Sequence, residues 1–133
     1  MDVSIIIVNY NTGKLILNLL ASIRKYVSDI TYEIIVVDNN SSENISELLL
    51  PYQNEVRYIL LPENVGFGRA NNKALEYATG RYIFFLNPDT LRFCAADHRN
   101  FFAFATFCCK QHVVSKAPIQ KFFGDFIPCI TVR

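Results

Sequence analysis

Bulky apolar residues gather in four short runs within the first 90 residues, and each run ends in a cluster of polar residues. The runs lack the polar alternation of a half-exposed strand, which is typical of strands covered on both faces in a parallel sheet. With their polar ends they read VSIIIVNYN (3–11), YEIIVVDNNSS (32–42), EVRYILLPEN (55–64) and RYIFFLNPDT (81–90). We therefore expect four buried strands.

Segments with helical spacing of their apolar residues separate these runs. The segments 12–27 and 65–80 each favour a helix, and a shorter helix is expected over 41–50, capped by Ser41 or Ser42 and ending before Pro51. Gly80 is expected to stop the helix in 65–80. The apolar residues expected to face the sheet are Leu15, Leu19, Leu20, Ile23, Ile45, Leu48, Leu50, Ala70, Ala74, Leu75 and Ala78.

Strands that alternate with helices through short connections predict right-handed crossovers and a mainly parallel sheet with helices on both faces. The predicted fold class is therefore an open α/β domain. At 133 residues the chain is long enough for one such domain with a real core.

Composition changes after residue 90. The tail, residues 91–133, holds eight of the eleven phenylalanines and all four cysteines but no tyrosine, and it has six basic and two acidic residues against seven and ten in 1–90. We expect residues 1–90 to form the α/β domain. The tail is either an ordinary continuation of that domain, with a helix over Arg92–Lys110, or a replacement of the native continuation after truncation or frameshift.

The net charge of +1 gives no reason to expect nucleic acid or an anionic membrane as a partner. Every apolar run is far shorter than the roughly 18 residues of a membrane-spanning helix. No signal-peptide pattern opens the chain. We expect a cytoplasmic protein, with a peripheral place at the inner face of the cell membrane as the alternative.

The cysteines follow no Cys-x2-Cys pattern, so reduced thiols are expected. Zinc ligation by Cys94, His98, Cys108 or Cys109, and His112 has suitable atom types. It is disfavoured because these spacings match no common zinc finger.

The polar clusters that end the four strands should meet, since the carboxyl ends of parallel strands share one edge, where ligands bind in open α/β sheets. The clusters are 9–11, 38–41, 63–66 and 87–90. Each alone is ordinary turn composition. Together they place two carboxylates, Asp38 and Asp89, at one edge. An aspartate there can accept the N–H of a pyrimidine base or hold Mg²⁺ or Mn²⁺ beside a diphosphate.

The segment GFGRAN (66–71) does not fit a dinucleotide-binding fingerprint. That fingerprint needs three glycines after the first strand, whereas Gly66 and Gly68 follow the third and Asn71 stands in the third glycine's place. The lysine of a phosphate-binding P-loop is also absent.

The four motifs VSIIIVNYN, IIVVDNNSS, NVGFGRANN and FFLNPDT, in this order, resemble the family 2 glycosyltransferases, most of all bacterial members of the rhamnosyltransferase type. The resemblance covers nearly all of residues 1–90. It implies the GT-A fold, a nucleoside-diphosphate sugar as donor, a divalent cation, Mg²⁺ or Mn²⁺, and hexosyl transfer with inversion to a saccharide or lipid-linked acceptor. UDP- or dTDP-sugars are the expected donors.

The resemblance also assigns roles to individual residues. It implies that Val8 and Tyr10 line the nucleoside pocket and that Asp38 binds the base. It places Asn64, Gly66 and Asn71 in the rest of the donor site. Asn87 and Asp89 match the ends of the family's acid-x-acid metal motif, with Asp89 facing the cation and Asn87 leaving it one charge weaker.

The sequence departs from the family after Thr90. The family's acceptor site and its catalytic base lie in a second half, and the tail does not resemble it. The only acids of the tail are Asp97 and Asp125. We expect donor binding without transfer. The alternative is a non-catalytic nucleotide-binding module, or an interaction domain whose phenylalanine-rich tail binds a partner or another copy of the chain.

Overall fold

The computed structural model describes residues 1–28, 30–89 and 112–115. Within them the chain forms five strands, two α-helices and one short 3-10 helix. In chain order these are β1 (Val3–Asn9), α1 (Gly13–Tyr26), β2 (Tyr32–Asp38), η1 (Leu50–Tyr52), β3 (Val56–Leu60), α2 (Phe67–Leu75), β4 (Tyr82–Phe85) and β5 (His112–Ser115). No helix among the described residues is long and apolar enough to cross a membrane.

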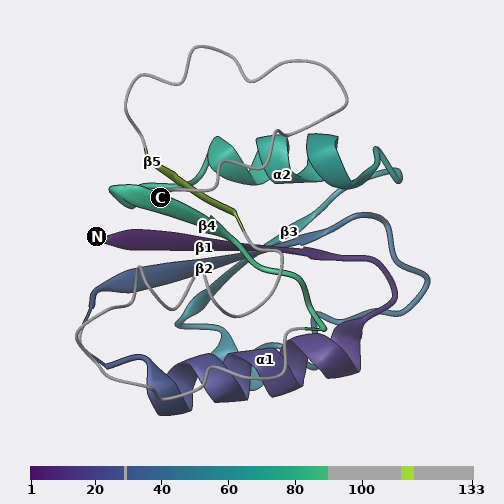
Figure 1. Ribbon diagram of the computed structural model, residues 1–133. Coiled ribbons are helices and arrows are strands. Elements are labelled where there is room, and N and C mark those ends of the chain that lie inside the picture. Colours follow the sequence, from purple (N-terminus) through teal and green to yellow (C-terminus); the bar gives the residue numbers. More distant parts are fainter. Residues whose placement is uncertain (29, 90–111, 116–133) are drawn as a thin grey trace.

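The strands form one sheet in the order β3-β2-β1-β4-β5. Strands β1, β2, β3 and β4 all run parallel to one another. Strand β5 pairs with β4 in the antiparallel direction, with His112 opposite Phe85. Figure 1 shows the sheet between α1 on one face and α2 on the other. The predicted α/β fold with a mainly parallel sheet and a helix on each face is confirmed.

Alternation along β1 divides the core into two layers. Ile5 and Ile7 pack in the layer that contains the inner face of α1, whereas Ile6 and Val8 pack in the layer that contains α2. The first layer contains large helix residues such as Leu19, whereas the second contains small alanines from α2 and from the segment after it. The alanines are Ala70, Ala74 and Ala78.

The helix predicted over 41–50 is wrong. The segment contains turns followed by the 3-10 helix Leu50–Tyr52, which includes Pro51. Ile45 and Leu49 are buried as helical spacing requires, but Leu48 and Leu50 are exposed. Neither Ser41 nor Ser42 caps a helix, because their side chains bond the loop after β1 instead.

The other predicted helices are present, with small differences. Leu15 and Leu75 are only partly buried, and Ile16 takes the inward position on α1. Helix α2 ends at Leu75, so Gly80 is not its stop. The sequence did not predict β5, and the predicted helix over Arg92–Lys110 lies outside the described residues, as do all four cysteines.

Gly80 has a different role, at the amino end of the sheet, where the chain enters β4. A Cβ at this position would lie 2.4 Å from the backbone nitrogen of Ser4 and 2.6 Å from the carbonyl carbon of Val3. Its N–H donates to Ser4 Oγ at 2.8 Å. The absence of a side chain therefore allows the α2–β4 connection to pack directly on β1.

Glu33 on β2 ties the same region together. Its Oε1 accepts hydrogen bonds from Ser4 Oγ at 2.6 Å, from the N–H and hydroxyl of Thr79 at 2.6 and 2.9 Å, and from the N–H of Gly80 at 3.2 Å. One carboxylate thus links β1, β2 and the connection to β4. Burial raises the pKa of Glu33, but the hydrogen bonds from Ser4, Thr79 and Gly80 outweigh it and leave the pKa below its ordinary value of 4.5.

We expect this link to weaken in acid. Because the folded-state pKa of Glu33 is lowered, its contribution to stability is present above pH 4.5 and is lost as pH falls through the lower folded-state value. Glu33→Gln should therefore lower the urea midpoint at pH 7 and should differ less from wild type near pH 3. Equal differences at both pH values would contradict the assignment.

Candidate functional site

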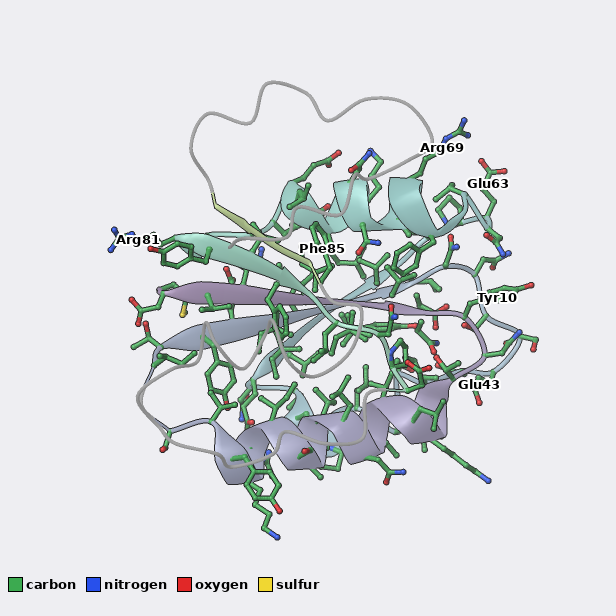
Figure 2. The ribbon with its side chains drawn as sticks, viewed as in Figure 1. Tyr10, Glu43, Glu63, Arg69, Arg81 and Phe85 are labelled. Atoms are coloured by element: carbon green, nitrogen blue, oxygen red, sulfur yellow. The ribbon has the colours of Figure 1, made fainter. Side chains whose placement is uncertain are left out.

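The polar ends of β1 to β4 lie at one end of the sheet, which we call the carboxyl edge: residues 9–12, 38–42, 62–66 and 87–89. The parallel register places Asn9 of β1 beside Asp38 of β2, and Asp38 beside Leu60 of β3. Figure 2 shows Tyr10 and Glu63 at this end of the molecule and Arg81 at the opposite end. The structure thus brings together the clusters that the sequence predicted to meet.

Asp38 is the centre of a buried hydrogen-bond network. Its Oδ2 accepts from Asn9 Nδ2 at 3.1 Å and from the Tyr58 hydroxyl at 3.1 Å, and its Oδ1 accepts from the N–H of Ser41 at 2.7 Å. The residue is 1% exposed. A carboxylate has about four acceptor positions. Three are filled by described residues, and the fourth, on Oδ1, has no partner among them.

Tyr58 supplies a neutral donor to this carboxylate. Burial first, then the charge of Asp38 and the hydrogen bond to it, raise the pKa of Tyr58 to about 12. The phenol therefore keeps its proton at physiological pH and donates it to Asp38. Sequence reasoning missed Tyr58, because a tyrosine within a strand is ordinary core composition.

The loops after β1 and β2 bond one another along the carboxyl edge. Ser41 Oγ accepts from Asn9 Nδ2 and from the N–H of Asn11, both at 2.9 Å. Asn11 Oδ1 accepts from the N–H and the hydroxyl of Ser42 at 2.8 and 2.9 Å. Asn11 and Asn40 have φ angles of 56° and 61°, a left-handed conformation that asparagine tolerates better than most residues. Asparagine is therefore suited to both turns.

Glu43 anchors the start of α1 to the same loops. Its Oε1 accepts from the N–H of Gly13, the first residue of the helix, at 2.6 Å. Thr12, the residue before the helix, makes no side-chain cap, so Glu43 takes that role from a distant segment. A carboxylate at a helix N-terminus is stabilising because it faces free N–H groups and the positive end of the helix dipole.

Tyr10 and Val8 differ in their access to a ligand. The Tyr10 side chain is 52% exposed at the carboxyl edge, whereas Val8 is buried in the core layer of α2. Asn71 is also buried, at 1% exposure, and its Nδ2 donates to the carbonyl of Phe67 at 3.0 Å. Asn64 and Gly66 are exposed. Of these five predicted site residues, three reach solvent at the edge.

Asn87 and Asp89 follow β4 and are exposed. Neither side chain is seen to hydrogen-bond another described residue, and both side chains lie at the carboxyl edge. No group of three or more histidine, cysteine or acidic residues gathers there among the described residues. An exposed carboxylate such as that of Asp89 suits Mg²⁺ or Mn²⁺, which usually take few protein ligands and complete their shell with water and phosphate oxygens.

Comparison with known proteins defines the class. A model of glycosyl transferase family 2 matches residues 4–91, more than half of the 133-residue chain. The chain belongs to glycosyl transferase family 2. The curated relatives that it matches include bacterial glycosyltransferases, and the matches span between 15% and 35% of their lengths.

Three relatives show the extent of the similarity. Escherichia coli WfgD, a UDP-Glc:α-D-GlcNAc-diphosphoundecaprenol β-1,3-glucosyltransferase, is 34% identical over 90 residues, which cover 67% of this chain and 35% of WfgD. Staphylococcus aureus TarS in complex with UDP-GlcNAc has a TM-score of 0.60 and 32% identity over 67% of this chain and 27% of that chain. The mannosyltransferase PcManGT from Pyrobaculum calidifontis, in complex with GDP-Man and Mn²⁺, has a TM-score of 0.63 and 25% identity over 70% and 29%. The predicted GT-A fold is thereby confirmed.

Proposed function

We propose that this chain binds the nucleoside-diphosphate sugar donor of a family 2 glycosyltransferase at the carboxyl edge. The observation that carries the proposal is the position of four polar strand ends at one end of the sheet, where a buried network around Asp38 joins β1, β2 and β3, within a family whose solved relatives bind UDP-GlcNAc and GDP-Man. A pyrimidine nucleotide, UDP or dTDP, is the donor class that suits an aspartate acceptor at this edge.

Different residues of the carboxyl edge would contact different parts of the donor. The exposed ring of Tyr10 offers a stacking surface for the base, and Asp38, although only 1% exposed, has on Oδ1 an acceptor position that no described residue fills and that suits a single N–H of a pyrimidine ring. Asn64 and Gly66 lie in the loop before α2, which Asn39 bonds to the end of β2, and they would bound the donor site there. Val8 and Asn71 support this surface from the core.

Asp89, with Asn87 beside it, would hold Mg²⁺ or Mn²⁺ against the diphosphate. The PcManGT complex with Mn²⁺ supports this choice of cation. When bound, such a cation stabilises negative charge on a leaving nucleoside diphosphate. Asp89 contributes a charged oxygen and Asn87 only a neutral one, so binding of the cation should depend mainly on Asp89.

Transfer with inversion requires a base that faces the acceptor, opposite the leaving group. The family match ends at residue 91, and the only acidic residues from 92 to 133 are Asp97 and Asp125. We infer that this chain binds a donor without transferring the sugar. The alternative, a non-catalytic nucleotide-binding module, makes the same binding prediction, and a transfer assay with a panel of saccharide and lipid-linked acceptors separates it from an active enzyme.

The proposed function predicts a selective rise in thermal stability. A ligand at a hundredfold excess over its Kd stabilises the native state by about 2.7 kcal/mol. UDP- or dTDP-sugar with Mn²⁺ should therefore raise the unfolding midpoint, whereas NAD should not, because the dinucleotide fingerprint is absent. A series in which NAD alone raises the midpoint, or no nucleotide does, would contradict the proposal.

Asp89→Asn should weaken donor binding only in the presence of the cation. The substitution keeps the shape of the side chain and removes its charge, so the loss in affinity for UDP with Mn²⁺ should be about tenfold or more, by titration calorimetry. Affinity for uridine without Mn²⁺ should stay unchanged. Asp2→Asn, an exposed substitution at the opposite end of the sheet, is the matched control.

A further inference from the structure

Asn39 is a buried polar residue at the carboxyl edge, next to Asp38. It follows β2 directly and is only 3% exposed. Its Oδ1 accepts from the N–H of Val65 at 2.9 Å, its Nδ2 donates to Asn64 Oδ1 at 2.8 Å, and its own N–H donates to the carbonyl of Asn9 at 2.9 Å. One buried residue therefore joins the ends of β1 and β2 to the loop before α2.

That loop, residues 62–66, has few other attachments. Asn64 Oδ1 also accepts from the N–H of Gly66 at 3.0 Å, and Gly66 leads into α2 with a φ angle of 83°. Within the described part of the chain, Asn39 is the only side chain from outside the loop that bonds it. Pro62, Glu63 and Asn64 are exposed, whereas Val65 is partly buried and packs against the core layer of α2. The Asn39 amide and the packing of Val65 thus hold the loop together, and Asn39 supplies the hydrogen bonds.

We propose that Asn39 is a positioning residue that holds residues 64–66 in place for the nucleotide sugar, an inference that rests on the donor binding proposed above. Both polar groups of its side chain are already bonded within the protein, so Asn39 acts through Val65 and Asn64. An amide suits this role because it accepts one hydrogen bond and donates another from the same plane, whereas an ionised aspartate has no donor for Asn64.

The test compares Asn39→Ala with Ser4→Ala in the 133-residue chain. Ser4 is also fully buried and also has two hydrogen bonds, to Glu33 and from Gly80, but it lies at the opposite end of the sheet. Two quantities are measured for each variant, under conditions where circular dichroism shows it folded. One is the amide hydrogen exchange of Val65 and Gly66 without ligand, and the other is the affinity for UDP with Mn²⁺.

In Asn39→Ala we expect exchange at Val65 to be about tenfold faster and UDP affinity to be about tenfold lower. In Ser4→Ala both should stay within about twofold of wild type, because distant sites act independently. Unchanged exchange at Val65 in Asn39→Ala would overturn the proposal, as would unchanged affinity despite faster exchange. Equal loss of affinity in both variants would also overturn it, since it would show a general loss of stability.

The wild-type titration is carried out first, because it separates a failure of the proposed function from a failure of the positioning role of Asn39. A wild-type chain that binds no UDP, dTDP or GDP nucleotide overturns the proposed function and the positioning role together. A wild-type chain that binds, followed by an Asn39→Ala variant that binds equally well, overturns the positioning role alone and leaves the proposed function standing.

Discussion

Gly80→Ala should destabilise the protein by about 3 kcal/mol or more, because the new Cβ would collide with backbone and not with a flexible side chain. The nearest atoms, the nitrogen of Ser4 and the carbonyl carbon of Val3, belong to β1, which is paired on both sides by β2 and β4. Strand β1 cannot move without disturbing both ladders. The substitution also displaces the Gly80 N–H from Ser4 Oγ.

Gly68→Ala is the matched control for this prediction. Gly68 lies within α2, and a Cβ there would meet nothing within 4 Å. Because alanine favours a helix over glycine, this variant should be about 0.5–1 kcal/mol more stable than wild type. Urea unfolding followed by circular dichroism measures both. A Gly80→Ala variant as stable as Gly68→Ala would show that β1 and the α2–β4 connection do not pack as described.

The strands β1 to β4 could be predicted from sequence because a short, continuous apolar run in a chain of this length is best explained as a buried strand. The run Ile34–Val37 is buried throughout, as its composition requires. The prediction of a helix over 41–50 was wrong because the hydrogen bonds that this segment makes with residues distant in the sequence outweighed its local helix propensity. Ser41 and Ser42 bond the loop after β1, at separations of 30 to 32 residues that no local pattern reveals.

The candidate site also combines features that follow from local sequence patterns with contacts between distant residues that do not. The presence of Asp38 and Asp89 at one edge followed from the rule for parallel sheets, and the structure places Asp38 at the last position of β2 and Asp89 after β4. The network around Asp38 could not be predicted, because Asn9 and Tyr58 lie 29 and 20 residues away in the sequence. Burial also separated residues that the family resemblance treats alike: Tyr10 is exposed, and Val8 is not.

Asp38→Ala should reduce both stability and nucleoside binding. It removes the acceptor of Asn9 Nδ2, the Tyr58 hydroxyl and the N–H of Ser41, and each buried donor without a partner costs about 1–3 kcal/mol. Since Tyr58 and Ser41 are only partly buried, we expect a total loss of about 3 kcal/mol. Urea unfolding at pH 7 measures it. A variant as stable as wild type would contradict the central place of Asp38 in the network.

Two further variants separate direct binding of the base from support of the edge. Tyr58→Phe removes one donor to Oδ2 and leaves Oδ1, the oxygen with an unfilled acceptor position, unchanged. If Asp38 contacts the base, uridine affinity without Mn²⁺ should fall about tenfold in Asp38→Asn and stay near wild type in Tyr58→Phe. Equal losses in both variants would instead mean that Asp38 shapes the edge without touching the ligand. We expect the first result, because the described residues leave one acceptor position on Oδ1 unfilled and a pyrimidine ring offers one N–H to fill it.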